Sequence, residues 1–180
     1  MSTTEFGGVG AIDTGDCSPD GGCAVVHQQG ARIGHPAMLV PGAMAGLQAV
    51  GAAVAATKLP QRTVDLVDIR VSEINGCGVC LLGHVKAARK HGESDERLAV
   101  VAGWRDAPFF SGSERAALAL AEAVTRLSDS ANPVPDDIWD EAAHHFDEEE
   151  LAALVVAIAN VNLWNRLNVA TRQIAGAYEW

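Results

Sequence analysis

The stretch QRTVDLVDIRVSEINGCGVCLLGHVKAARKH, residues 61–91, decides the class of fold. Valines in its first half recur every three or four residues, as on the buried face of an amphipathic helix. Asn75-Gly76 interrupts this pattern, because both residues favour turns. A second helical segment starts at about Cys77 and ends at Gly92, a residue type common just after a helix. The stretch therefore predicts two consecutive helices.

The chain around this stretch also predicts helices. Ser111 and Glu114 form a capping box, in which each side chain bonds the other residue's backbone N–H at a helix start. Asp147 and Glu150 repeat this pattern before the last helix, whose middle is apolar on nearly every side, as expected for a helix at a bundle centre or subunit interface. No convincing strand pair is present, so the sequence predicts an all-α bundle of about seven helices. Their expected ranges are 36–57, 61–73, 77–91, 94–103, 111–127, 135–146 and 147–174.

The composition agrees with one helical domain. The chain has 180 residues, of which 48% are hydrophobic and only 5% aromatic, and this length suffices to bury a core. Because alanine, valine and leucine supply most of the apolar surface, closely packed helices are favoured over an aromatic-rich sandwich of strands. The formal net charge is −10, which argues against a nucleic-acid partner.

Residues 1–34 differ from the rest of the chain. They hold eight of the 18 glycines and show no sustained periodicity, which predicts an irregular arm whose order would come from a neighbouring subunit. Residues 35–180 are expected to form the helical domain. The arm contains Cys17 and Cys23, which could pair with each other, exchange with another cysteine pair or be incidental.

The start of the chain does not predict a secretory signal, because no basic residue precedes Arg32 and no apolar block is present. The longest apolar run, around 151–161, is too short to span a bilayer. We therefore expect a cytoplasmic protein without a membrane partner. In that compartment disulfides are transient, so a cysteine pair indicates a catalytic, redox-sensing or metal-binding site.

The residues most indicative of chemistry are Cys77, Cys80 and His84. Their spacing of three and four residues places them on one helix face, and the preceding turn places both cysteines in the first helical turn. Free N–H groups and the positive end of the helix dipole stabilise a thiolate there. A histidine one turn after a cysteine can accept its proton. The pattern favours a redox-active dithiol.

Two other interpretations remain open for these residues. The cysteines could be small buried hydrophobic residues. They could also bind zinc with His84, but this would need a fourth ligand, and the sequence has no second C-x-x-C or H-x-x-x-H motif. His144 and His145 could supply that ligand only if the fold happened to bring them near.

The chain resembles the alkylhydroperoxidase (AhpD-like) core of the carboxymuconolactone decarboxylase superfamily over about residues 36–175. This resemblance implies an all-helical bundle that assembles as trimers or hexamers. It rests on the matching residues Asp65, Leu66, Arg70, Ser72, Ile74 to Cys77, Cys80, His84, Trp104, Arg105, Phe109, Glu114 to Ala119, Glu122, Ala123 and Asn162 to Arg166.

The resemblance implies a role for each matching site residue. Cys80 would attack a hydroperoxide, Cys77 would resolve the resulting sulfenic acid into a disulfide, and His84 would relay protons. The family has a glutamate twelve residues before the first cysteine, where this chain has the shorter Asp65. Glu73, four residues before Cys77, is an alternative proton acceptor. No organic or metal cofactor is needed, and a dithiol, thioredoxin-like or lipoyl-type donor would reduce the disulfide.

Two alternative functions remain. The cysteine pair could act as a redox sensor or interaction switch, or the protein could be a cofactor-free lyase like the decarboxylase relatives, although that branch lacks the cysteine pair.

Among the remaining polar and aromatic residues, we expect Trp104 and Trp164 in the core, at an interface or in a pocket wall. The polar residues of the apolar last helix need buried partners on another helix or subunit. These are Asn162, Asn165 and Arg166.

Overall fold

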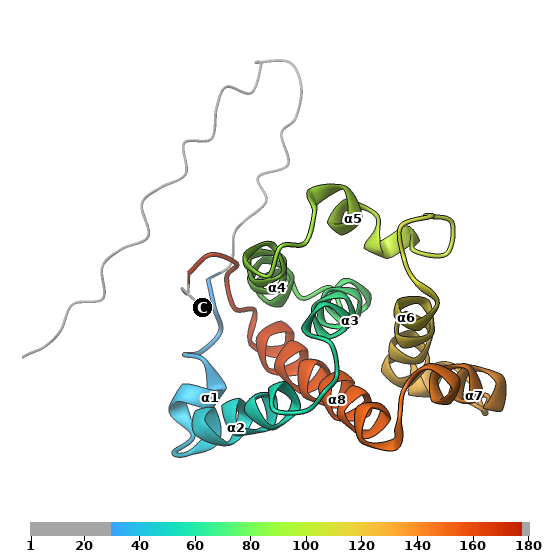
Figure 1. The fold of residues 1–180 in the computed structure, drawn as a ribbon. Helices are drawn as coiled ribbons and strands as arrows, with labels where there is room; N and C mark the ends of the chain where they lie inside the picture. The colour runs from blue at the N-terminus through green and yellow to red at the C-terminus, as the bar shows by residue number, and fades with distance from the viewer. Residues whose placement is uncertain (1–29, 178–180) are drawn as a thin grey trace, which may run out of the picture.

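The computed structural model of the protein describes residues 30–177, and within them the predicted all-α fold is confirmed (Figure 1). The described residues form eight α-helices and two short 3-10 segments, with no strand. The elements are α1 (Pro36–Leu39), α2 (Ala43–Ala55), α3 (Gln61–Ile74), α4 (Gly78–Lys90), α5 (Asp95–Ala99), η1 (Val101–Gly103), α6 (Gly112–Thr125), η2 (Leu127–Asp129), α7 (Asp136–His145) and α8 (Glu148–Thr171).

Helix α3 lies at the centre of the bundle. It packs against α4, α6 and α8, and α2 lies on the outer side of α8 (Figure 1). The periodic valines of α3 behave as the sequence predicted, since Val67 and Val71 are fully buried. They join a core cluster with Leu120 of α6 and Leu154 of α8. The opposite side of α3 packs into a second cluster that includes the buried Trp104.

The helix starts follow the predicted caps. Both capping boxes are present, from Ser111 to Glu114 and from Asp147 to Glu150. Helix α8 ends three residues earlier than predicted, because Arg172 takes a left-handed conformation (φ 52°) and closes the helix. None of the described helices is both long and apolar enough to cross a membrane.

The single helix expected over residues 36–57 is wrong, because the structure divides it into α1 and α2. Pro41 cannot continue the backbone hydrogen bonds of a helix, and Gly42 has a φ of 81°, which a glycine adopts at little cost. The expected helix over 94–103 is likewise divided into α5 and the 3-10 segment η1.

The segment before α1 lies against the end of α8. The backbone N–H of Arg32 donates to Thr171 O (2.9 Å), and the Gln173 side chain donates to Ile33 O (3.1 Å). Most of the predicted arm, with Cys17 and Cys23, lies outside the described residues, so its irregular structure remains a prediction.

Candidate active site

The site begins at the turn between α3 and α4. Gly76, with a φ of 65°, reverses the chain, and Cys77 then caps α4 by accepting a hydrogen bond from the Cys80 N–H (3.3 Å). Cys77 and Cys80 form a disulfide, with 5.4 Å between their Cα atoms. Both are buried, with exposed fractions of 2% and 6%. The predicted spacing therefore does bring the two cysteines together at the helix start.

Polar residues of α8 hold this turn in place. Asn75 Nδ2 donates to the side-chain oxygens of Asn162 and Asn165, both at 2.9 Å, and Asn165 Nδ2 donates to Ser72 Oγ (3.1 Å). The partners expected on another helix are thus confirmed for Asn162 and Asn165, whereas Arg166 bonds Asn162 within α8 itself. The interhelical bonds tie the end of α3 to the second half of α8 and so help to fix where α4 begins.

Cys80 opens onto a cavity of about 260 Å³ between α2, α4 and α8. The cavity is mostly apolar, and Trp164 forms part of its wall. Asn168 Nδ2 donates to Cys80 Sγ (3.3 Å) and to Trp164 O (3.0 Å). The other lining residues are Gln48, Gly83, His84 and Ala87. A reactive Cys80 would therefore face a small apolar space with an amide donor at its sulfur.

His84 shares this cavity with Cys80 and lies beside a carboxylate of α3. Its Nδ1 is 3.4 Å from Oδ2 of Asp68. Burial lowers the pKa of His84 to about 4, although the negative charge of Asp65 acts in the opposite direction. Burial raises the pKa of Asp68 well above its usual value, and the charge of Asp65 raises it further. His84 is consequently neutral near pH 7.

The two carboxylates expected to assist His84 have other partners. Asp65 Oδ2 lies 2.8 Å from Nδ1 of His91, and its other oxygen accepts a hydrogen bond from Gln61 (2.9 Å). Glu73 pairs with Arg70 at 3.0 Å. Within the described residues, neither carboxylate bonds His84 or a cysteine. Asp65 acts on His84 only as a nearby charge, whereas the closely placed carboxylate is that of Asp68.

Sequence reasoning missed three residues at this site. Asp68 is one helical turn after Asp65, so the helical period alone could have suggested it. Asn168 is a third buried asparagine in the apolar helix α8, and the need of such a residue for a partner was a usable signal. His35 lies near the cavity only through tertiary packing. Its ring centroid is 5.8 Å from that of Trp164.

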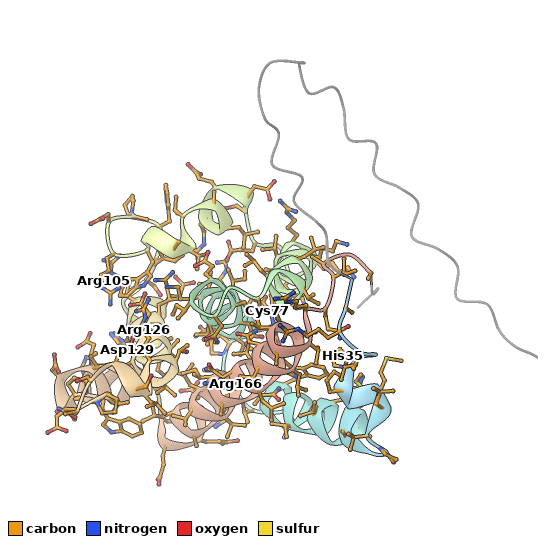
Figure 2. All side chains as sticks on the ribbon, turned by 180° about the vertical axis from the view of Figure 1, so that it is seen from behind. His35, Cys77, Arg105, Arg126, Asp129 and Arg166 are labelled. Carbon is orange, nitrogen blue, oxygen red and sulfur yellow. A yellow bond between two sulfur atoms is a disulfide. The ribbon has the colours of Figure 1, made fainter. Side chains whose placement is uncertain are left out.

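The imidazole of His35 is almost fully buried and connects to the disulfide through Asn168. Burial lowers the pKa of His35, and a hydrogen bond with the Asn168 side chain acts against this. Figure 2 shows His35 and Cys77 on one side of the molecule, with Arg105 and Arg126 on the other. Among the described residues, no three His, Cys, Asp or Glu side chains cluster closely enough to hold a metal ion.

Comparison with known proteins defines the class to which this fold and site belong. The model of the carboxymuconolactone decarboxylase family matches residues 41–123, from just before α2 into α6. The chain is 37% identical over 114 residues to YdfG, an uncharacterized protein of Bacillus subtilis (strain 168), covering 63% of this chain and 76% of YdfG. The protein belongs to the carboxymuconolactone decarboxylase family.

Solved structures assign the chain to the AhpD-like group. The chain resembles a protein of unknown function from Agrobacterium tumefaciens, proposed to be the antioxidant-defence protein AhpD, with 33% identity and a TM-score of 0.76. The match covers 82% of this chain and 99% of that one. The debrominase Bmp8, solved with 2,3,4-tribromopyrrole, shares the fold at 20% identity and a TM-score of 0.70, over 78% of this chain and 74% of Bmp8.

Proposed function

We propose that the protein is a thiol-dependent peroxidase that reduces organic hydroperoxides. The observation that carries this proposal is the cavity that Cys80 and His84 both line, with Asn168 donating a hydrogen bond to the Cys80 sulfur. Its apolar lining suits the alkyl or aryl part of a hydroperoxide, and the two cysteines supply the two electrons that the reduction needs. The similarity to a protein proposed to act in antioxidant defence supports the same assignment.

The reaction starts from the reduced protein. The Cys80 thiolate attacks the terminal oxygen of the hydroperoxide, the O–O bond breaks, and the alcohol leaves after taking up a proton. Cys80 is now a sulfenic acid. The Cys77 thiol displaces its hydroxyl group, which leaves as water, and the disulfide forms. A thiol donor then returns both cysteines to the reduced state.

His84 would move the proton of Cys80 in this scheme. Because its pKa is about 4, the imidazole is neutral at pH 7 and can accept a proton. Its Nδ1 side faces Asp68, so Nε2 is the atom available to Cys80. A negative charge on Asp68 would stabilise the imidazolium that forms briefly. The proton is then delivered to the leaving alkoxide.

The test is consumption of cumene hydroperoxide with a dithiol donor. We expect Cys80→Ser and His84→Ala to lower kcat/KM by at least about 100-fold, since each removes a group that acts on the reacting atoms. Cys77→Ser should still react once and accumulate a sulfenic acid that dimedone traps. His144→Ala, an exposed histidine on α7, is the matched control and should retain full activity. Full turnover by Cys80→Ser would contradict the proposal.

The same assay separates the two aspartates. Asp68→Asn should lower kcat/KM by about tenfold, because an amide beside Nδ1 cannot take up the negative charge that would stabilise the imidazolium. Asp65→Asn should have the smaller effect, because Asp65 bonds His91 instead. The reverse order would assign the relay to Asp65, the position that the family resemblance indicates.

A further inference from the structure

The disulfide contacts two different cavities. The first contains Cys80 but not Cys77, as described above. The second, of about 190 Å³, contains Cys77 but not Cys80. Asn168 lines both cavities and therefore lies at the boundary between them. Each cysteine of the disulfide thus lines a cavity of its own.

The second cavity differs from the first in chemistry. Its wall includes Arg172 and Gln173, from the end of α8, together with the glycines on either side of Cys77. Arg172 is exposed, and no carboxylate of the described residues pairs with it. In a chain of net charge −10, this exposed cation offers an anion a favourable position in the cavity that Cys77 lines.

A second cation lies close to the same helix end. The backbone N–H of Arg32 donates to Thr171 O (2.9 Å), and its Nη1 donates to Ala170 O (3.0 Å). These two bonds hold Arg32 at the last turn of α8. Arg172 directly follows that turn in the chain. Two cations of the described residues, Arg32 and Arg172, therefore lie at this end of α8, although the protein as a whole is acidic.

We propose that the second cavity is the binding site of the thiol reductant, and that Arg172 selects thiols that carry a carboxylate. This inference rests on the proposed function, in which the disulfide must be reduced in every cycle. It assigns the two substrates to opposite cysteines: the hydroperoxide reaches Cys80 from the first cavity, and the reductant reaches Cys77 from the second.

The chemistry of thiol–disulfide exchange agrees with separate sites for the hydroperoxide and the reductant. A thiolate attacks a disulfide sulfur in line with the bond that breaks. Attack on Cys77 from the second cavity forms a donor–Cys77 mixed disulfide and expels Cys80 as a thiolate, which the Asn168 amide stabilises by its hydrogen bond. A second donor thiol then attacks the donor sulfur and releases the Cys77 thiol. Two thiols lose two electrons in total and leave as one disulfide.

The test measures the two half-reactions separately by stopped flow. The probes for reduction are 3-mercaptopropionate and its amide, which differ in charge, with rates compared per thiolate. We expect the oxidised protein to react about fivefold faster with the carboxylate at low ionic strength, as a single exposed charge pair allows, and high salt should remove the difference. Arg172→Asn should abolish the preference and leave the rate of oxidation by cumene hydroperoxide unchanged, since asparagine tolerates the left-handed conformation.

Three further variants serve as controls for this measurement. Lys90→Gln removes an exposed cation from the end of α4 and should keep the preference for the carboxylate. Gly78→Val narrows the second cavity and should slow reduction by both probes, whereas Gly78→Ala should not, because a Cβ at Gly78 would meet only Ala175 at 3.9 Å. Iodoacetamide added during reduction should trap the mixed disulfide by alkylating the free thiol. Peptide mapping should then find the donor on Cys77 and the alkyl group from iodoacetamide on Cys80.

The outcomes distinguish this inference from the proposed function. Equal rates with both probes, or a donor attached to Cys80, would overturn the inference even if hydroperoxide oxidation proceeds. Failure of hydroperoxide to oxidise the protein would overturn the peroxidase proposal. The reductant site would be supported if the wild type prefers the carboxylate probe, Arg172→Asn loses that preference, and the donor is found on Cys77. This holds whether or not hydroperoxide oxidises the protein.

Discussion

His84 is the residue whose environment has the clearest measurable consequence. In the folded protein its pKa is about 4, against a usual value of 6.5. Between these two pH values the unfolded chain binds more protons than the native one. His84 therefore makes the free energy of unfolding fall as the pH is lowered from 6.5 to 4, by up to about 3 kcal/mol.

Urea unfolding at pH 7, 5.5 and 4 would measure this effect. We expect His84→Gln to lose less stability than the wild type on acidification, because the substituted side chain does not titrate. The contribution of Asp68 to the pH dependence of the free energy of unfolding has the opposite sign. Its pKa is raised in the native state, so just above the usual pKa of an aspartate the native protein still holds the proton that the unfolded chain has released. Asp68→Asn should therefore steepen the loss on acidification. Parallel curves for the wild type and His84→Gln would contradict the assignment.

Between the helices, Glu122 of α6 acts as a buried ionic junction. One oxygen accepts hydrogen bonds from Arg70 of α3 (2.7 Å) and from the Trp104 indole (3.0 Å), and the other accepts one from Arg105 (2.7 Å). Burial acts against the charged form, but the bonds from Trp104, Arg105 and Arg70 hold the pKa of Glu122 below its usual value. The junction links α3 to α6 and to the segment after η1.

Removing the charge at this junction should destabilise the bundle. We expect Glu122→Gln to lower the free energy of unfolding by about 2 kcal/mol, because the partly buried Arg70 would lose one of its two carboxylate partners and keep only Glu73. Glu141→Gln, in the exposed pair with His145, is the matched control and should change it by less than about 0.5 kcal/mol. Chemical denaturation of both variants measures the two changes in the free energy of unfolding. Equally small changes would show that the bonds of Glu122 contribute little to stability.

At the scale of the whole molecule, α1 and α2 form a largely exposed apolar surface. Residues 36–57 contain no Asp, Glu, Lys or Arg, and Val54 is the one buried residue of α2. Met38 is 67% exposed and Leu39 60%. Such a surface is unusual for a monomer in water. Because the rest of the chain is acidic, this uncharged face is also where two copies repel each other least.

We propose that a second copy of the chain covers this surface, in agreement with the trimers or hexamers that the family resemblance implies. Sedimentation or light scattering at micromolar concentration should give an oligomer for the wild type. Met38→Asp should shift it toward monomers, because a charge would be buried in the interface. Leu127→Asp, at an exposed apolar position outside α1 and α2, should leave the oligomer intact. A monomeric wild type would contradict the proposal.

The features that the sequence determined by itself are local ones. Helix starts were predictable at Ser111 and Asp147, because a cap is made by residues three positions apart. Cys77, Cys80 and His84 were predictable as a group for the same reason, since a single helix sets their spacing. The division between α1 and α2 was missed although Pro41 and Gly42 carry the signal, because the apolar pattern continues across them.

Tertiary structure alone decided what surrounds the disulfide. Whether Asp65 or Asp68 faces His84 depends on how α3 and α4 are rotated against each other, and the sequence does not state that rotation. Asn168 and His35 reach the site only because α8 packs beside α4 and the segment before α1 lies against the end of α8. The two cavities, one at each cysteine, likewise arise from the packing of side chains far apart in the chain. Short-range hydrogen bonds and helical periodicity are encoded locally, whereas distances between helices follow from the packing of the whole core.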